Sequence, residues 1–392
     1  MKAALIATNA ASMVRLFNEN NIQLLLDAGY EVHIACNFEK NNTFPQEEVD
    51  KCKADWESRG LVLHQFATNR SPLSLDNLKA FFDLRKILSK KHFDLVHCHA
   101  PISSVICRLA AKKHRRKGTK VMYTAHGFHF FKGAPLLNWL VYFPIEWFCS
   151  FFTDILITIN KEDFAFAKKH MHAKNTEYIP GVGVDTVSLK NITINREEKR
   201  EELGIPLDSI AVLSVGELNA NKNHEVVLRA IAKLDRKDIV YVICGIGKKE
   251  AFLIDLAKEL GLDNRLILLG YRTDIAEINK CCDIFAFPSL REGLPVSLLE
   301  AVSVGLPAVV SKTRGNRDII DGKNGFLCKA DCPNEFADAI LRLAESPDLR
   351  REISLTAMST AAKFDISNIN SLMPSFYTGA NIETNVADTA LV

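Results

Sequence analysis

Short apolar runs alternate with amphipathic stretches along most of the chain, and this alternation constrains the fold more than any other feature. The expected strands lie at residues 3–7, 31–36, 61–66, 94–97, 120–125, 154–159, 210–215, 239–244, 266–269, 283–287 and 308–310. Helical patterns separate them, and strands that alternate with helices form right-handed crossovers in a parallel sheet. In such α/β sheets, ligands bind outside the carboxyl ends of the strands. Function is therefore expected in the loops that follow the strands.

The length of the chain predicts more than one domain. A chain of 392 residues is too long for one ordinary hydrophobic core. The alternation lapses into a polar stretch at residues 181–197, which we interpret as the linker. We therefore expect an N-terminal doubly wound domain over residues 1–190 and a C-terminal one over residues 191–365. Residues 366–392 are expected to form a tail, which from residue 378 is polar and patternless.

Composition excludes several classes of protein. Hydrophobic residues make up 47% and charged residues 24%, as in soluble globular proteins. A net charge of +2 argues against a nucleic-acid binder that works by bulk electrostatics. Ten irregularly spaced cysteines without a signal-peptide pattern indicate free thiols and a cytoplasmic protein. The most apolar segment, residues 134–159, is interrupted by Pro144, Glu146 and Asp154, so no membrane-spanning helix is expected.

Residues 287–307, FPSLREGLPVSLLEAVSVGLP, carry the most informative pattern. A strand leads through a loop into a helix expected at residues 294–304, with Glu292 before it and Glu300 inside it. Eight residues advance a helix by roughly 12 Å and return to almost the same face. The free N–H groups of the helix start favour an anion. This layout suits a ligand with phosphate between two hydroxyl-bearing ends, such as a nucleotide-sugar. Glutamates near a helix start can also be ordinary helix chemistry.

A second loop, GELNANKNH at residues 216–224, also joins a strand to a helix. Lys222 stands at the mouth of that helix, where its charge would face a phosphate. Alone, this signal is weak. The pair Gly245 and Gly247 is weaker, because the third glycine of a dinucleotide-binding pattern is missing.

Histidines follow two strands of the first half. His126 comes directly after a strand and precedes a glycine, so it could contact a ligand or cap the strand end. His97, Cys98 and His99 lie on a strand, where Cys98 points away from both histidines. No further ligand stands at a suitable spacing, so structural histidines are favoured over a metal site.

A basic run at residues 112–117 ends one helix and precedes the aromatic segment. One interpretation is a solvated helix end. The other is a surface that docks on an anionic membrane leaflet, with the aromatic helix beside it.

With Gly216, Lys222, the Gly270–Tyr271–Arg272 run and the Glu292/Glu300 pair in this order, the chain resembles a family 4 retaining glycosyltransferase of the GT-B fold. It is most similar to the branch that acts in bacterial capsule, exopolysaccharide or O-antigen assembly. The resemblance covers about residues 1–365. It implies two Rossmann-like doubly wound domains that face each other across a cleft.

The resemblance also implies roles for individual residues. Glu300 would hold the donor ribose, Glu292 the hydroxyls of the donor sugar, and Lys222 the leaving diphosphate. His126 would pack against the donor sugar, and the backbone around Arg272 would read the base. The remaining donor-side candidates are Gly216, Gly293, Leu294, Pro295 and Val296, and the acceptor-side candidates are Asn9, Ser12 and His129. Residues 181–185 match the hinge region of the family.

The function implied is hexosyl transfer (EC 2.4) from a nucleotide-sugar, expected to be a UDP-sugar, to a hydroxyl of a lipid-linked saccharide acceptor. The anomeric configuration would be retained, without a metal or other cofactor. The protein would be cytoplasmic, with a peripheral position on the inner face of the cell membrane and no nucleic-acid partner.

The chain departs from the family at Glu217, where an arginine usually follows the first-loop glycine. A carboxylate there would repel a diphosphate unless it turned away or paired with Lys222. The first loop of the chain also lacks the glycine pair of many members, with residues 9–12 (NAAS) in its place. One alternative hypothesis is therefore a catalytically inactive homologue that binds a nucleotide-sugar or a partner. A third, ranked lower because the Glu292/Glu300 spacing is less expected there, is another GT-B enzyme such as a nucleotide-sugar epimerase or a phosphorylase.

Overall fold

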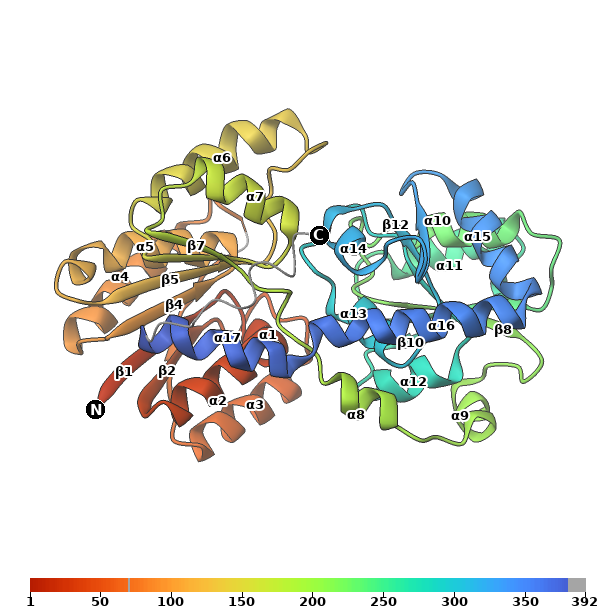
Figure 1. The fold of residues 1–392 in the computed structure, drawn as a ribbon, viewed down its shortest axis with the longest axis horizontal. Coiled ribbons are helices and arrows are strands. Elements are labelled where there is room, and N and C mark those ends of the chain that lie inside the picture. Colours follow the sequence, from red (N-terminus) through yellow and green to blue (C-terminus); the bar gives the residue numbers. More distant parts are fainter. Residues whose placement is uncertain (70, 380–392) are drawn as a thin grey trace. The chain divides into compact units, whose positions relative to one another are not determined.

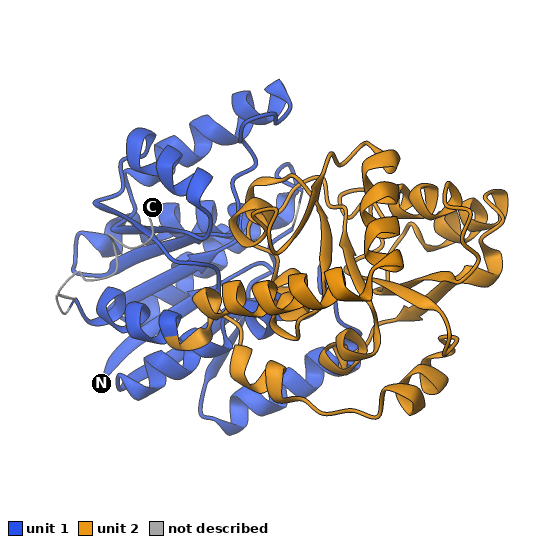
Figure 2. Ribbon diagram, turned by 45° about the vertical axis from the view of Figure 1, so that its right-hand side comes forward, with its two compact units in different colours: residues 1–182, 368–392 blue, residues 183–367 orange. Residues whose placement is uncertain are grey.

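The structure, a computed structural model, describes residues 1–69 and 71–379 (Figure 1). It divides into two compact units, shown in different colours in Figure 2. Unit 1 consists of residues 1–182 and the segment from Asn368, and unit 2 of residues 183–367. The boundary between the units lies after residue 182, whereas the sequence predicted it after residue 190. No helix among the described residues is long and apolar enough to cross a membrane.

Unit 1 contains one parallel sheet of seven strands in the order β3-β2-β1-β4-β5-β6-β7. The central strands are apolar along their whole length and are buried, as expected when helices cover both faces of a parallel sheet. The strands are β1 (Lys2–Ala7), β2 (Tyr30–Cys36), β3 (Val62–Gln65), β4 (Leu95–His99), β5 (Lys120–Ala125), β6 (Ile155–Thr158) and β7 (Asn175–Tyr178). The pattern missed β7 because its sequence, NTEY, is polar and only half-buried.

Helices lie on both faces of this sheet. Figure 1 shows α4 and α5 on one side of it and α2 and α3 on the other. The helices of unit 1 before the linker are α1 (Ala11–Phe17), α2 (Glu19–Asp27), α3 (Gln46–Ser58), α4 (Leu75–Lys90), α5 (Pro101–Arg115), α6 (Leu136–Ser150) and α7 (Lys161–His170). The single helix predicted at residues 12–28 is two helices, because Asn18 between them leaves helical geometry (φ −129°, ψ −2°).

A buried ion pair fixes α6 to the interior of unit 1. The guanidinium of Arg108 on α5 donates to Glu146 of α6 at 2.7 Å, and both side chains are almost fully buried. Tyr123 of β5 donates its hydroxyl to the other oxygen of the same carboxylate at 3.2 Å. Because these side chains are buried, water cannot take the place of a lost partner, and the polar contact holds the inner face of α6.

The C-terminal segment was predicted to be a tail, but its first part is a helix, α17 (Ile366–Thr378). From Asn368 onward α17 belongs to unit 1. The hydroxyl of Tyr377 lies 3.3 Å from Nδ1 of His97, and the carbonyl of Tyr377 accepts from Tyr30 at 3.4 Å. The helix was missed because its apolar positions are widely interspersed with Ser and Asn. The rest of the expected loose tail, residues 380–392, lies outside the described residues.

Unit 2 contains a second parallel sheet, in the order β10-β9-β8-β11-β12-β13. Numbered from its own first strand, this is the order 3-2-1-4-5-6 of a Rossmann fold. Its strands are β8 (Ile210–Val215), β9 (Ile239–Cys244), β10 (Leu266–Gly270), β11 (Ile284–Phe287), β12 (Ala308–Ser311) and β13 (Gly325–Cys328). The predicted class, α/β with two doubly wound parallel sheets, is confirmed.

The helices of unit 2 include two that the sequence pattern did not reveal. α8 (Thr186–Asn191) lies in the expected linker and begins where Asp185 accepts a hydrogen bond from the N–H of Ser188. α14 (Arg314–Ile319) has no apolar periodicity. The others are α9 (Arg196–Leu203), α10 (Glu225–Ala232), α11 (Glu250–Glu259), α12 (Ile275–Cys281), α13 (Val296–Ser303), α15 (Pro333–Glu345) and α16 (Pro347–Ala361), with 3₁₀ turns at Asp263–Arg265 and Ala362–Phe364.

Asp283 fixes the start of β11, the strand that leads into the most informative loop. One carboxylate oxygen accepts from Arg200 at 2.6 Å and from the N–H of Ala211 on the neighbouring strand at 2.8 Å. The other accepts from Arg196 at 2.7 Å. Because the guanidinium of Arg200 is buried, its charge depends on this partner.

We expect Asp283→Ala to lower the free energy of unfolding by about 3–5 kcal/mol, because it leaves the buried charge of Arg200 unpaired. Denaturant unfolding measures the change. Asp255→Ala is the control, since Asp255 is 78% exposed and its nearest cation is 3.9 Å away. Equal stability of the two variants would contradict the role given to Asp283.

Candidate active site

The sheet order of unit 2 places two loops beside each other. β8 and β11 are neighbours, and the chain continues from β8 to β9 on one side and from β11 to β12 on the other. Right-handed crossovers in opposite directions place the two following helices on opposite faces of the sheet. Such a switch point leaves a crevice outside the carboxyl ends of the two strands. The loop after β8 carries Lys222, and the loop after β11 carries Glu292. The two stretches that the sequence singled out separately therefore meet.

Glycines allow the loop after β8 to pack against the loop after β9. A Cβ on Gly245 would lie 2.0 Å from the carbonyl oxygen of Gly216, and one on Gly247 would lie 2.5 Å from that of Leu218. The N–H of Leu218 donates to Ile246 at 3.0 Å across the same contact. Gly245 and Gly247 are thus explained by the close approach of the two backbones. In the sequence they matched only an incomplete dinucleotide-binding pattern.

Two asparagines join the loop after β8 to the loop after β11. The amide of Asn221 donates to the carbonyl of Arg291 at 3.0 Å, and the amide of Asn223 donates to Pro288 at 3.3 Å. Asn223 has a positive φ of 54°, which asparagine tolerates better than most residues. Sequence reasoning missed both, although the three asparagines of NANKN were the signal available.

Lys222 and Glu292 form an ion pair at the centre of these loops. The Nζ of Lys222 lies 2.8 Å from Oε1 of Glu292, and the two side chains are 20% and 13% exposed. The same Nζ lies 4.5 Å from the centre of the Phe287 ring, within cation–π range. Gly216 lies under the lysine stem, since a Cβ there would come within 3.1 Å of it. The ammonium group is therefore held in one position before any ligand arrives.

Glu217 takes no part in this ion pair. Its side chain is exposed, and no hydrogen bond or ion pair from the described residues reaches its carboxylate. Lys222 pairs with Glu292 instead. Of the two arrangements that would make Glu217 compatible with a diphosphate, the structure excludes the pairing with Lys222.

The helix after Glu292, α13, begins at Val296, two residues later than predicted. Its first N–H groups have no intrahelical acceptor and form the positive end of the helix. Gly293 and Leu294 are packed against the start of α14, because a Cβ on Gly315 would lie 2.2 Å from the carbonyl oxygen of Gly293. Pro295 is the N-cap and has no N–H, so it shapes this segment without donating.

Glu300 lies inside α13 and is half-buried. Burial raises the pKa of its carboxyl from 4.5 to about 7. No described group donates a hydrogen bond to this carboxylate, so nothing offsets its loss of solvation. A partly desolvated acceptor without a partner is suited to accept hydrogen bonds from ligand hydroxyls.

Arg272 is engaged by side chains of its own unit. Its guanidinium donates to Asp274 at 2.8 Å and to Glu202 at 2.8 Å. Lys199 joins this network through Asp274 at 2.7 Å. The hydrogen bond with Arg272 holds the pKa of Asp274 below its usual range. The side chain thus fixes the loop after β10, and the backbone is the part left for a ligand.

In unit 1, His126 follows β5 and is part of a buried histidine cluster. Its Nε2 lies 3.0 Å from Nδ1 of His99, the last residue of β4. Burial lowers the pKa of His126 to about 4, so its imidazole is neutral. The ring of Phe17 lies 5.3 Å from that of His126, and both line a small hollow with Asn20 and Asn21.

The three acceptor-side candidates have structural partners. Ser12, at the start of α1, accepts from the N–H of Thr43 at 3.2 Å and so holds the following loop. Asn9 accepts from Thr8 at 3.4 Å. The ring of His129 stacks on Tyr142 of α6 at 4.6 Å. Asn9 and Ser12 thus lie together at the end of β1, whereas His129 lies against α6.

Cys98 points away from the neighbouring histidines, as predicted from strand alternation. Its Sγ donates to the carbonyl of Met122 at 3.2 Å, while His97 hydrogen-bonds Thr124 at 2.8 Å. Among the described residues, no three His, Cys, Asp or Glu side chains are grouped so that they could hold a metal ion.

Sequence comparison gives matches along both units. The family model "Glycosyl transferases group 1" matches residues 195–359, and "Glycosyl transferase 4-like" matches residues 4–160. EpsD of Bacillus subtilis (strain 168) is 36% identical over 354 residues, which are 89% of each chain. An Escherichia coli UDP-Gal:alpha-D-GlcNAc-diphosphoundecaprenol alpha-1,3-galactosyltransferase is 32% identical over 280 residues, which are 69% of this chain and 71% of that protein.

Solved structures show the same fold. Anabaena Alr3699/HepE in complex with UDP superimposes with a TM-score of 0.76 at 20% identity, covering 97% of this chain and 100% of that one. WaaG, a glycosyltransferase involved in lipopolysaccharide biosynthesis, gives 0.74 at 16% identity, covering 96% and 100%. Two Rossmann-like domains of this kind define the GT-B class. The chain belongs to the family 4 glycosyltransferases, and its activity is glycosyl transfer.

The pKa of Glu300 makes stability depend on pH. Because the folded pKa is raised, the protonated carboxyl favours folding below about pH 4.5, and this contribution is lost as the pH rises through about 7. We expect Glu300→Gln to be more stable than the parent at pH 8, by roughly 1–3 kcal/mol. Urea unfolding at a series of pH values measures the difference, with Glu250→Gln as an exposed control. A constant difference between pH 5 and 8 would contradict the shifted pKa.

Proposed function

We propose that the protein transfers a hexose from a UDP-sugar to a hydroxyl of a lipid-linked saccharide, with retention of anomeric configuration, in cell-surface polysaccharide synthesis. The observation that carries this proposal is the ammonium of Lys222, held at the switch point of unit 2 beside the start of α13. A lysine charge and a helix N-terminus are together suited to a diphosphate.

The Lys222–Glu292 ion pair links binding of the donor diphosphate to recognition of the transferred sugar. In the free protein Glu292 neutralises Lys222 at 2.8 Å. When a diphosphate takes over the ammonium, the carboxylate of Glu292 is released and accepts hydrogen bonds from hydroxyls of the transferred sugar. Glu300 accepts from the ribose, and the backbone around Arg272 contacts the base. The contact of His126 with the donor sugar stays a prediction.

The protein would act through position and charge. The acceptor hydroxyl attacks the anomeric carbon from the face that the diphosphate leaves, and a donor phosphate oxygen takes its proton. Lys222 and the first N–H groups of α13 stabilise the charge that develops on the departing diphosphate. We propose that no metal is required, since these groups occupy the role of the cation and the sequence has no Asp-x-Asp motif.

Names of related proteins support the choice of substrates. A Campylobacter jejuni relative with 32% identity is a 4-alpha-N-acetylgalactosaminyltransferase that acts on a diphospho-undecaprenol-linked saccharide. The Escherichia coli relative is named for UDP-Gal and a diphosphoundecaprenol-linked acceptor. Anabaena Alr3699/HepE was solved with UDP-glucose. The Escherichia coli name prints both a UDP donor and a lipid-linked acceptor, and we extend these two features to this chain.

We expect Lys222→Ala to lower kcat by on the order of 100-fold or more, because a charge that stabilises the transition state is removed. Glu217→Gln should keep kcat within about 2-fold, since that side chain is exposed and is not the partner of Lys222. Turnover is measured as release of UDP from a panel of UDP-sugars, with a lipid-linked acceptor present. Retention is read from the anomeric configuration of the product.

The same experiment distinguishes an active transferase from an inactive homologue. Calorimetric binding of UDP by the parent protein, without turnover of any sugar in the panel, would overturn the catalytic proposal. Unchanged turnover in Lys222→Ala would overturn the role of the ion pair even if the enzyme were active.

We further propose that α6 docks unit 1 on the anionic inner leaflet. The outer face of α6 exposes six large apolar side chains by 40% or more: Leu136, Leu137, Leu140, Ile145, Trp147 and Phe148. The exposed cations Lys112 and Lys113 lie in the last turn of α5, and the exposed Arg116 and Lys117 follow it. The two features are adjacent, because Nζ of Lys112 lies 4.4 Å from the Phe152 ring at the end of α6. Apolar surface beside cations is the pattern of an interfacial helix.

We expect the protein to sediment with phosphatidylglycerol-containing vesicles at low salt and to be released as salt increases. Leu137→Ser with Leu140→Ser should reduce binding at least about 10-fold, because two buried leucine contacts with lipid are lost. Leu78→Ser is the matched control, a leucine 58% exposed on α4. Equal binding by the double variant and the control would contradict docking through α6.

A further inference from the structure

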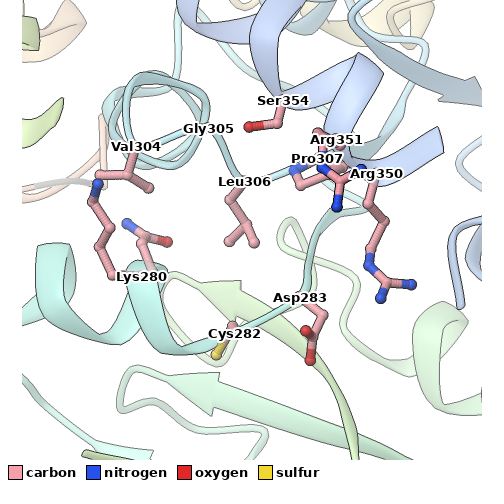
Figure 3. A pocket seen from close by; sticks show the side chains of 11 residues that line it. Lys280, Cys282, Asp283, Val304, Gly305, Leu306, Pro307, Arg350, Arg351 and Ser354 are labelled. Atoms are coloured by element: carbon pink, nitrogen blue, oxygen red, sulfur yellow. The ribbon is translucent and has the colours of Figure 1, made fainter. Parts of the chain in front are cut away.

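Unit 2 has an open cavity of about 240 Å³ beside the strand ends opposite the candidate active site. Asp283 lines it and directly precedes β11, while Leu306 and Pro307 line it and precede β12. The cavity therefore lies at the amino ends of these strands, and the Lys222–Glu292 pair lies beyond their carboxyl ends. Figure 3 shows Arg350, Arg351 and Ser354 on one side of the cavity and Lys280 on the other.

A buried amide without partners lines this cavity. The side chain of Asn279 on α12 is 1% exposed, and neither its nitrogen nor its oxygen has a hydrogen-bond partner among the described residues. Buried amides are almost always paired, because an unpaired one keeps the full loss of its hydration. A molecule in the cavity would supply both the donor and the acceptor that Asn279 lacks.

The lining carries an excess of positive charge. It contains the cations Lys280, Arg350 and Arg351 and one acid, Asp283. Asp283 is already neutralised by Arg196 and Arg200, neither of which lines the cavity. The thiol of Cys282 adds no negative charge, since its hydrogen bond to Cys281 and its burial raise its pKa. An anion is therefore the ligand that the charges favour.

The cations are placed so that they can turn toward a ligand. Arg350 uses one nitrogen, Nη1, on the carbonyls of Leu343 and Ala344, and no described group accepts from its other nitrogens. Arg351 pairs with Asp348 at 3.0 Å, but both side chains are more than 70% exposed. Such a surface pair contributes little and is readily exchanged.

The remaining lining favours a small molecule with hydroxyl groups. The hydroxyl of Ser354 lies over Gly305, where a Cβ would come within 2.5 Å of its oxygen. Gly305 thus leaves space that any other residue would fill. A volume of 240 Å³ is several times that of one water and admits a molecule the size of a sugar.

We propose that this cavity is a second ligand site of unit 2, which binds a small phosphate monoester that also carries hydroxyl groups. The phosphate is held by Arg350, Arg351 and Lys280, and the hydroxyls pair with the amide of Asn279 and the hydroxyl of Ser354. The site is separate from the one proposed for the nucleotide-sugar and does not depend on it.

Thermal unfolding with glycerol 3-phosphate or glucose 1-phosphate tests the proposal. Saturating UDP is present throughout, so that phosphate binding near Lys222 does not contribute. We expect Tm to rise with the concentration of either ester, and to rise less with inorganic phosphate at the same concentration. Asn279→Leu should abolish the rise without loss of basal stability, because a leucine of similar size removes the unpaired amide. Lys222→Ala should keep the rise.

A second variant covers the case in which Asn279→Leu does not fold. Arg351→Gln changes an exposed side chain, and it should weaken the response to glycerol 3-phosphate about 10-fold in concentration. Lys258→Gln, an exposed lysine of the same unit outside the cavity, is its control. The proposal is overturned if neither ester raises Tm, if the rise survives Asn279→Leu, or if Arg351→Gln and Lys258→Gln behave alike.

Discussion

The pairing of β8 with β11 is the constraint on which the candidate site of unit 2 depends. It brings Lys222 within 2.8 Å of Glu292, although 70 residues separate them in the chain. Asparagines and glycines then fix the two loops by backbone contacts, so the charges keep their positions without a ligand. A site arranged in this way loses little entropy when the donor binds, which is the main advantage of positioning in catalysis.

Much of the fold could be predicted from the sequence, because the apolar strands are buried on both faces and read as unbroken runs. The pattern failed where burial is partial, as in β7, and where caps rather than periodicity mark a helix, as in α8. Glu292 and Lys222 were each predicted to matter. Their mutual ion pair could not be predicted, since it follows from the strand order and from the conformation of both loops. That Lys222 pairs with Glu292 and not with Glu217 was open for the same reason.

The two ends of the unit 2 sheet differ in how they treat polar groups. At the carboxyl ends, Lys222 and Glu292 neutralise each other, and the half-buried carboxyl of Glu300 has no partner among the described residues. At the amino ends, Asp283 is fully paired while the amide of Asn279 is not. A buried polar group that lies beside a cavity and has no partner can form hydrogen bonds with a ligand, whereas paired groups make the structure rigid. Both ends therefore combine a rigid anchor with polar groups that have no partner among the described residues.

The buried pair of Arg108 with Glu146 has a consequence for how such a chain can diverge. It fixes the inner face of α6 through polar contacts, so the outer face contributes little to folding. Substitutions among the exposed positions of α6 are then nearly neutral for stability. Related chains can change the hydrophobicity of this face, and with it the surface they associate with, while their sheets and loops stay the same.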